Sequence, residues 1–521
     1  MERIWAEEAS FWKSEESHRR TIESALGWLT IADRMEPGIA ELRAFAAEVS
    51  RDTDRVVVLG MGGSSLAPLV FSDSFPAAQG SPRLEVLDST EPASVLAMLR
   101  GGTASRTMYV VSSKSGTTLE PNVFFDFFYA EAQKELGERA GERFVVVTDP
   151  GSALEKEAGK RKVRRVFPGD PRIGGRYSAL SNFGIVPAAL AGIDVAELLR
   201  RGREMAELCR RPGRDNPGLA LGAAIASLAL AGHDKLTFDV GAPIGRFGMW
   251  TEQLVAESTG KEGKGILPVE GEPLGGVSDY GRDRLFAALR RSTDEDGWRH
   301  VERLVSGGHP AARSSVDDAL DLSAQMFLWE FATAVAGRVL GINPFDQPNV
   351  QEAKDRTNEI LQGGGADRGS PGTGGGEVAE LLASIRPGDY FAILAYVPST
   401  EEHELLLSET RLRVRDSKRV ATTVGFGPRF LHSTGQFHKG GPPSGVFLQI
   451  TAEPREDVAI PGKPWSFGQV VAAQAAGDLA ALRSRGRRAA RVHLGPDVAA
   501  GLRELDRAVA GALETGGGRR A

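Results

Sequence analysis

The stretch from Val110 to Thr118 has the residue types of an anion-binding turn. A short apolar run over 108–111 predicts a buried strand, and the apolar, aromatic-rich residues after 118 predict a helix. The backbone N–H groups of a first helical turn are free, and hydroxyls beside them favour a phosphate. An ordinary helix cap, the alternative, would need only one or two hydroxyls. The candidate phosphate ligands are Ser113, Lys114, Ser115, Thr117 and Thr118.

A second turn, rich in glycine and serine, follows the Val-rich stretch 55–59. Its glycines, which include Gly63, let the backbone turn sharply and approach a ligand closely, and Ser64 adds a hydroxyl. The turn is not the dinucleotide fingerprint, because G-x-G-x-x-G needs glycine where Ser65 stands. We therefore expect it to support the first turn in holding a phosphate.

The elements that must carry these turns have the pattern of a doubly wound α/β sheet. Apolar strands are predicted over 55–59, 84–87, 108–111, 144–148 and 163–167, and helical segments follow most of them. Such parallel sheets bind ligands beyond the carboxyl ends of their strands, where both turns lie. The preceding fifty residues are predicted to form a helical arm.

Two charged residues further along could act on a bound ligand. Glu257 ends an apolar helical stretch before Gly260, and burial there would raise its pKa towards that of a general base. The alternative is an exposed carboxylate at a helix end. Arg176 follows two glycines at a predicted helix start, so it points into a cleft or lies on the surface.

Four residues nearer the C-terminus are further candidates. Gln347 and Lys354 would share one helical face if a single helix spanned both, although a solvated lysine is the alternative. His432 and His438 lie in one Gly/Ser-rich loop after a predicted strand, which is typical of a functional loop, with exposed histidines as the alternative. No cysteine or carboxylate stands at ligand spacing from them, so no metal site is predicted.

The chain is predicted to divide at glycine-rich and polar stretches. A glycine-rich segment with GGG at either end predicts a flexible linker, and strands and helices resume beyond it. The expected units are a helical arm (1–50), a first α/β domain (51–195), a second (196–362), the linker (363–376), a smaller C-terminal α/β domain (377–514) and a tail (515–521).

Composition excludes several classes of partner. The 521 residues carry a net charge of −6, so no global basic field recruits nucleic acid. Cys209 is the only cysteine, which excludes a disulfide framework and fits a reducing compartment. The sequence contains neither an apolar run of membrane-spanning length nor a signal-peptide pattern. We expect a cytoplasmic protein with no nucleic-acid or membrane partner.

Taken in order, these stretches resemble the glucose-6-phosphate isomerase (phosphoglucose isomerase) family, which is built on two sugar-isomerase (SIS) domains. The matching stretches are Gly60–Ser64, Ser113–Thr118, Gly174–Ser178, Gln253 with Glu257–Lys261, and Phe345–Lys354. The resemblance implies two doubly wound, flavodoxin-like SIS domains followed by the smaller α/β domain. It also implies a small phosphosugar substrate and no cofactor or metal.

The resemblance further implies the reversible conversion of glucose 6-phosphate to fructose 6-phosphate through a cis-enediol. Glu257 would carry the proton between C2 and C1, Arg176 would stabilise the enediolate, and Lys354 would assist ring opening. The hydroxyl-rich turn would hold the phosphate. Further substrate-binding residues implied by the resemblance are Gly63, Ser64, Gln253 and Gln347.

The sequence departs from the family in one segment. The family has a Gly-Gln-His segment shortly after its base, and its histidine helps to open the sugar ring, but 271–280 contains no histidine. Thr434–His438 is similar to that segment but lies in the third domain. We therefore expect His438, or less favourably His432, to open the ring.

The added domain makes the chain most similar to the isomerase part of transaldolase/phosphoglucose isomerase fusions. That resemblance implies a functional association with a transaldolase, and the family implies a homodimer. Other functions stay open: an isomerase of another phosphosugar such as mannose 6-phosphate, or a non-catalytic SIS-type sensor. A sensor would need the phosphate turn but not Glu257, Arg176 and Lys354. The third domain could also be a partner-binding module.

Overall fold

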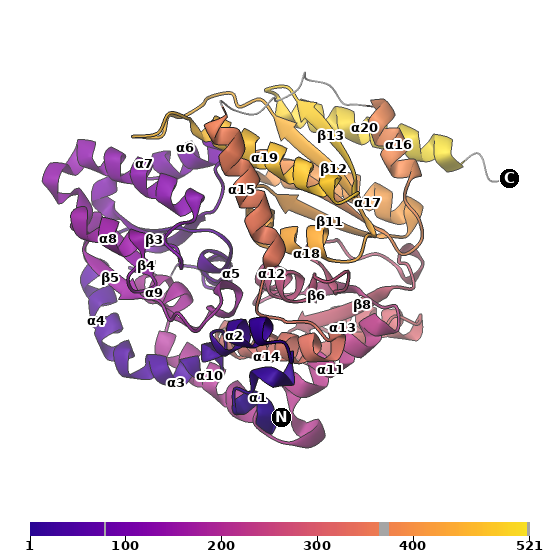
Figure 1. Cartoon of the computed structure of the whole chain (residues 1–521), viewed down its shortest axis with the longest axis horizontal. Coiled ribbons are helices and arrows are strands. Elements are labelled where there is room, and N and C mark those ends of the chain that lie inside the picture. Colours follow the sequence, from indigo (N-terminus) through magenta and orange to yellow (C-terminus); the bar gives the residue numbers. More distant parts are fainter. Residues whose placement is uncertain (78–79, 364–374, 518–521) are drawn as a thin grey trace.

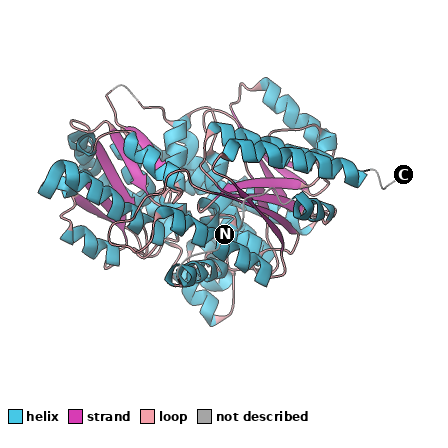
Figure 2. Cartoon of the chain, turned by 90° about the horizontal axis from the view of Figure 1, so that it is seen from above, coloured by secondary structure: helices cyan, strands magenta, loops and turns pink. Residues whose placement is uncertain are grey.

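The computed structural model describes residues 1–77, 80–363 and 375–517, which form three parallel β-sheets covered by helices (Figure 1). The first and third sheets appear as separate layers flanked by helices in Figure 2. The predicted α/β class, with two parallel-sheet domains and a smaller C-terminal α/β domain, is therefore confirmed, and the third sheet is parallel as well.

The first sheet has the order β2-β1-β3-β4-β5, with every pair parallel. Its central strands are fully buried apolar runs, because helices cover both of their faces. The strands are β1 (Arg55–Leu59), β2 (Arg83–Leu87), β3 (Thr107–Ser112), β4 (Phe144–Thr148) and β5 (Arg165–Pro168). The helices are α5 (Leu66–Ser74), α6 (Pro92–Arg100), α7 (Leu119–Leu136), α8 (Ala153–Lys160) and α9 (Asn182–Leu190).

The N-terminal helices are part of the core that joins the first two sheets. The indole of Trp12 donates to the Ala334 carbonyl at 2.7 Å, and the Trp28 ring packs against Tyr177 and Phe331. This aromatic packing seats the arm on both domains. The helices are α1 (Glu2–Trp5), α2 (Glu16–Glu23), α3 (Ile31–Met35) and α4 (Ile39–Val49).

The second sheet has the order β7-β6-β8-β9 and is also all-parallel. The buried helix α14 packs against α10 and α11. The strands are β6 (Lys235–Val240), β7 (Leu267–Val269), β8 (Arg284–Arg290) and β9 (Ala311–Ser315). The helices are α10 (Val195–Leu208), α11 (Pro217–Leu230), α12 (Phe247–Thr259), α13 (Glu295–Ser306), α14 (Leu322–Leu340) and α15 (Pro348–Gln362).

The third sheet has the order β11-β10-β12-β13, with strands β10 (Tyr390–Tyr396), β11 (Ala421–Phe426), β12 (Gly445–Ala452) and β13 (Arg488–Leu494). Its helices are α16 (Gly375–Ala383), α17 (Glu401–Lys418), α18 (Gly435–Gly440), α19 (Phe467–Ser484) and α20 (Val498–Gly517). Helix α15 packs along α19, between the first and third domains (Figure 1).

Two predicted boundaries differ from the structure. Most of the predicted linker, 364–374, lies outside the described residues, but its last two residues already belong to α16. The predicted tail begins too early, because α20 continues to Gly517. Residues 518–521 also lie outside the described part.

A buried ion pair of the second domain is hydrogen-bonded to the third domain. Arg284 of β8 and Glu272 are 2.9 Å apart, and both side chains have no exposed surface. The same guanidinium donates to the Val420 carbonyl, and the Glu272 carboxylate accepts from the Thr422 hydroxyl at 2.7 Å. Because a buried charge is costly when unpaired, these bonds fix the third domain in place.

Candidate functional site

The hydroxyl-rich turn connects β3 directly to α7, as the sequence predicts. The Ser113 hydroxyl is buried and has no hydrogen-bond partner among the described residues, and Thr118 begins α7 without a side-chain cap. The hydroxyls of Ser115 and Thr117 lie 3.0 Å apart. Gly116 has φ +66°, and a Cβ there would lie 2.9 Å from the Leu154 nitrogen. The turn thus presents unused donors, as an anion site requires.

Lys114 lies in this turn, and its ammonium is already paired with a carboxylate of the protein. It forms an ion pair with Asp149, which follows β4. The Lys114 charge is therefore compensated within the protein, and its contact with a phosphate stays a prediction.

The first glycine-rich turn contacts the segment that carries Arg176. Gly63 lies in the 3₁₀ helix η4 (Gly62–Ser64), and Arg176 lies in η7 (Gly175–Tyr177). A Cβ at Gly63 would lie 2.1 Å from the Gly175 carbonyl oxygen, so only glycine allows this approach. The close contact places Arg176 beside the buried Ser64 turn.

Arg176 is the centre of the site, since its guanidinium is 2% exposed and uses all five of its N–H groups. The bonds tie η7 to the end of α12 and to the loop before α15. The acceptors are Ser258 Oγ (2.8 Å), Glu257 Oε2 (3.2 Å), Gln347 Oε1 (2.7 Å) and the carbonyls of Pro344 (2.8 Å) and Asp346 (2.9 Å).

Glu257 lies in the last turn of α12 and is 6% exposed, so its carboxylate is buried and not exposed at the helix end. Its Oε2 accepts from Arg176, and its Oε1 accepts from Gln253 Nε2 at 3.3 Å. Burial raises the pKa of Glu257, and the neighbouring Arg176 opposes that rise. A buried carboxylate with a raised pKa suits a general base.

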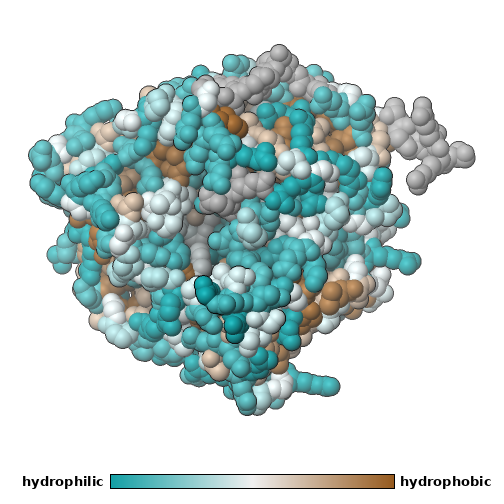
Figure 3. Space-filling model, in the orientation of Figure 1, coloured by the Kyte–Doolittle hydropathy of each residue, from teal (hydrophilic) through white to brown (hydrophobic). Residues whose placement is uncertain are grey.

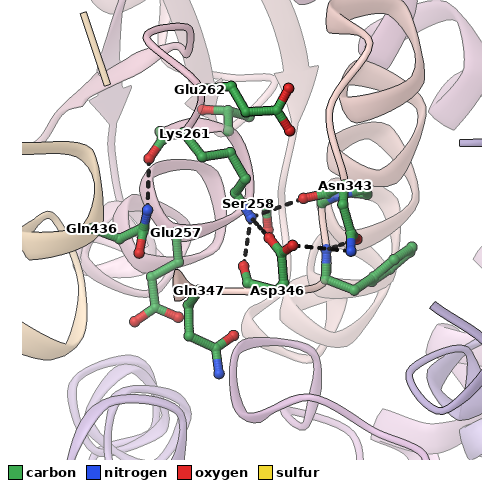
Figure 4. Close-up of polar contacts among 12 residues, drawn as sticks. Glu257, Ser258, Lys261, Glu262, Asn343, Asp346, Gln347 and Gln436 are labelled. Atoms are coloured by element: carbon green, nitrogen blue, oxygen red, sulfur yellow. Dashed lines mark hydrogen bonds and ion pairs between the residues drawn. The ribbon is translucent and has the colours of Figure 1, made fainter. Parts of the chain in front are cut away.

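Lys261 holds the loop that carries Gln347. Its ammonium donates to the Asn343 carbonyl and to the Asp346 carboxylate, both at 2.8 Å (Figure 4). Figure 4 also shows the Glu257 carboxylate beside the Gln347 amide. Burial lowers the pKa of Lys261 to about 8. The sequence motif contains this lysine, but only the structure shows that it positions the loop.

His432 lies at this site, at the end of the 3₁₀ helix η11 (Arg429–His432). Its Nε2 is 3.1 Å from Glu120 Oε1, and its carbonyl accepts from Gln253 Nε2 at 2.8 Å. A Cβ at Gly62 would lie 3.0 Å from its Cβ. His432 therefore adjoins both the glycine-rich turn and the amide that contacts Glu257.

His438, by contrast, is part of the third-domain core, which corrects the preference expressed for it above. Its Nδ1 is 2.9 Å from the Tyr390 hydroxyl, and its ring packs on Tyr390 and Phe447. Burial holds its pKa well below the usual range. Helix α18 turns this side chain inward, so the geometry favours His432 for chemistry at the site.

Lys354 and Gln347 do not share a helical face, because α15 begins at Pro348 and Gln347 is its N-cap. Lys354 instead lines a cavity of about 380 Å³ together with Thr117, Glu120 and His432. This cavity joins the hydroxyl-rich turn to the histidine. It has the concave form and convergent polar groups of a ligand site.

The sequence analysis missed Glu120, which directly follows the hydroxyl-rich turn. Burial alone would raise its pKa, but His432 reverses the effect, and the pKa lies below its usual value. Its partners His432 and Gln474 come from the third domain, so no local pattern could reveal them. A carboxylate beside a phosphate turn was the available signal.

The described residues contain neither a metal-binding group of three or more His, Cys, Asp or Glu nor a helix long and apolar enough to span a membrane. On the face shown in Figure 3 hydrophilic residues predominate, with separate apolar patches.

Comparison with solved structures shows the fold class. A hypothetical protein of Thermus thermophilus matches with a TM-score of 0.58 and 24% identity, over 69% of this chain and 96% of that one. A glucose-6-phosphate isomerase from Chlamydia trachomatis matches with a TM-score of 0.53 and 19% identity, over 69% and 77%. Fold and site together define an α/β protein of parallel sheets with a buried Glu–Arg pair.

Sequence comparison then shows the family. The phosphoglucose isomerase family model matches residues 31–264. A glucose-6-phosphate isomerase of Rubrobacter xylanophilus is 31% identical over 385 residues, 64% of this chain and 88% of the relative. One of Carboxydothermus hydrogenoformans is 27% identical over 395 residues, 64% and 85%. The chain belongs to the phosphoglucose isomerase family, although Gln347, Lys354 and His432 lie beyond the span matched by the model.

Proposed function

We propose that this protein is a glucose-6-phosphate isomerase that converts the aldose to fructose 6-phosphate reversibly. The observation that carries the proposal is the buried Glu257, held by Arg176 and by Gln253, which also bonds to the carbonyl of His432 at the cavity that Thr117 lines. Membership of the family and its curated members support the same reaction. A sensor would need the turn alone and would gain nothing from a buried base.

The phosphate would rest on the Ser113–Thr118 turn, which leaves the sugar to extend along the cavity towards His432. In ring opening the C1–O5 bond breaks as the C1 hydroxyl loses a proton and O5 gains one. His432 donates through Nε2 to Glu120, so its Nδ1 carries the lone pair for this exchange. Lys354 lines the same cavity and is the second group offered for proton transfer.

Isomerisation follows in the open-chain form of the sugar. Glu257 removes the C2 proton and returns it to C1, and the hydroxyl proton moves from O2 to O1, so atoms and charge balance. Every Arg176 N–H already has an acceptor, so this residue stabilises the enediolate through its fixed positive charge. Gln347 orients the Arg176 guanidinium, and Gln253 orients the His432 segment.

We also propose a cellular setting and an assembly for this enzyme. Family resemblance supports a cytoplasmic homodimer and an association with a transaldolase. Cys209 is buried, and burial raises its pKa to about 12, so its thiol is unreactive.

The test is turnover of Glu257→Gln in a coupled assay against glucose 6-phosphate, fructose 6-phosphate and mannose 6-phosphate. General base catalysis contributes about 10²–10⁴-fold, and we expect a loss of that size in kcat with phosphosugar binding retained. Glu262→Gln is the matched control, because Glu262 lies nearby but bonds to Lys13 at the surface. More than about a tenth of wild-type turnover would refute the role of Glu257.

The substrate panel separates the remaining alternatives. Turnover of mannose 6-phosphate above glucose 6-phosphate would move the assignment to another phosphosugar isomerase. Tight binding of these sugars without turnover in the wild-type chain would indicate a sensor.

A further inference from the structure

A buried hydrogen-bond chain lies behind His432 and crosses two domains. The Thr90 hydroxyl donates to Gln474 Oε1 at 2.7 Å, and Gln474 Nε2 donates to Glu120 Oε1 at 2.7 Å. The three side chains belong to residues that are at most 4% exposed. Thr90 and Glu120 come from the first domain, whereas Gln474 comes from α19 of the third.

The hydrogen bonds from Thr90 through Gln474 to Glu120 can run in only one direction. An ionised carboxylate accepts hydrogen bonds and donates none, so Gln474 must present its amide N–H to Glu120. Its carbonyl oxygen then faces Thr90, which supplies the hydroxyl donor. The Glu120 carboxylate is thereby held against rotation inside the protein.

The orientation of Glu120 sets the tautomer of His432. The same oxygen, Oε1, accepts from Gln474 and lies 3.1 Å from His432 Nε2. An imidazole that donates through Nε2 has its lone pair on Nδ1, and no hydrogen bond from the described residues uses that Nδ1. Arg429 also fixes this 3₁₀ helix, through two 2.7 Å bonds to Asp88.

We propose that Gln474 is a positioning residue that holds Glu120 so that His432 keeps its Nε2–H tautomer and offers Nδ1 for proton transfer. This inference rests on the proposed isomerase function. It gives the third domain a second contribution to the site: the domain supplies His432 and also the amide that orients the partner of His432. A side chain that orients an imidazole through a carboxylate acts on the rate without touching the substrate.

The first test reads the tautomer directly in the ligand-free protein. Gln474→Met keeps the side-chain length and removes both amide bonds. Ring ¹⁵N NMR of His432 should show the Nε2–H tautomer in the wild-type chain and a mixture in the variant. Gln449→Met is the matched control, because Gln449 is a buried amide of the same domain that bonds to the Ala475 carbonyl and not to Glu120. An unchanged tautomer in Gln474→Met would overturn the proposal.

The second test separates positioning from general damage. Loss of one hydrogen bond to a charged group predicts about a tenfold fall in kcat for Gln474→Met. If ring opening is the impaired step, the deuterium isotope effect of [2-²H]glucose 6-phosphate stays at or below the wild-type value. A larger isotope effect would place the damage at Glu257 and would contradict the proposal.

A gentler variant guards against misfolding of Gln474→Met. Thr90→Val preserves shape and removes only the hydroxyl that fixes the Gln474 amide. It should shift the tautomer in the same direction by a smaller amount, and no shift in either variant would refute the inference. If the wild-type chain turned over no phosphosugar, the isomerase function would fail, whereas the NMR result would still decide the tautomer claim.

Discussion

The pair His432→Asn and His438→Asn is the most direct test of the site. The two histidines belong to one short segment and have different surroundings. His432 faces Glu120 at the cavity, whereas His438 bonds to Tyr390 in the third-domain core. Asparagine keeps a polar amide in each place and removes the titratable ring. The two variants should therefore fail in different ways.

His432→Asn should lose activity and keep its fold. Removing a general acid–base group costs about 10²–10⁴-fold, and we expect a fall in kcat of at least about 100-fold. The Glu120 carboxylate keeps its bond from Gln474, so the site retains one of its two hydrogen bonds to that oxygen. The midpoint of urea unfolding should move little.

His438→Asn should lose stability and keep its activity. Its ring stacks on Tyr390 and meets the edge of Phe447, and its removal leaves the Tyr390 hydroxyl without its Nδ1 partner. An orphaned buried hydroxyl costs about 1–3 kcal/mol and a lost aromatic contact about 0.5–1.5 kcal/mol. We expect a fall of about 2–4 kcal/mol in the free energy of unfolding, with kcat per folded molecule within about twofold of wild type.

The assay is coupled oxidation of the glucose 6-phosphate formed from fructose 6-phosphate, with folded protein measured by urea unfolding. A catalytically dead His438→Asn that is folded, together with an active His432→Asn, would reverse the assignment. Equal losses of kcat in both variants would show that the loop acts as one unit and would refute the separation argued from the structure.

Two further predictions concern the surroundings of the site. Glu252 lines a cavity of about 250 Å³, and burial, with Glu270 nearby, raises its pKa to about 8. The folded state then holds a proton that the unfolded state has lost, so stability falls as pH rises from about 4.5 to about 8. Glu252→Gln should remove that fall and gain about 4 kcal/mol in urea unfolding at about pH 8 but less than about 1 kcal/mol at about pH 5; parallel curves would contradict it. Gly63→Ala should lower kcat by about 100-fold in the coupled assay, because its Cβ would lie 2.1 Å from the Gly175 carbonyl and must displace Arg176. Gly38→Ala, with no atom within 4 Å of the new Cβ, is the control, and similar activity in the two variants would refute the argument.

Central strands buried on both faces are the ones that the sequence predicted most directly. β1, β3 and β4 are apolar runs between turns, and every residue in them is buried. The sequence analysis missed β7, β8, β9 and β13. β8 is a central buried strand, but arginine stands at both of its ends. The other three are edge strands: β7 has only three residues, and β9 and β13 have arginine and serine or histidine among theirs. An edge strand leaves part of its surface to solvent and tolerates charge, so its pattern resembles that of a loop.

The site divides in a similar way between local and distant contacts. Arg176 and Glu257 stand in contiguous motifs, so residue type and spacing were sufficient to propose them. The choice between His432 and His438 depends on which way the short helix α18 faces, and both lie in one polar loop sequence. Glu120 and His432 are 312 positions apart, so nothing near either residue marks the pair.

The structure also explains how an added domain can take part in chemistry that requires precise placement. The amide of Gln253 donates to the His432 carbonyl at 2.8 Å and to Glu257 Oε1 at 3.3 Å, so one side chain links the third-domain histidine to the second-domain base. A displacement of about 1 Å at such a site can cost about 10²-fold in rate. The third domain must therefore be rigid relative to the second, and the bonds from Arg284 to the Val420 carbonyl and from the Thr422 hydroxyl to Glu272 contribute to that rigidity. Because these are hydrogen bonds to buried charged groups, each worth about 1.5–3 kcal/mol, the domain cannot rotate away without losing them.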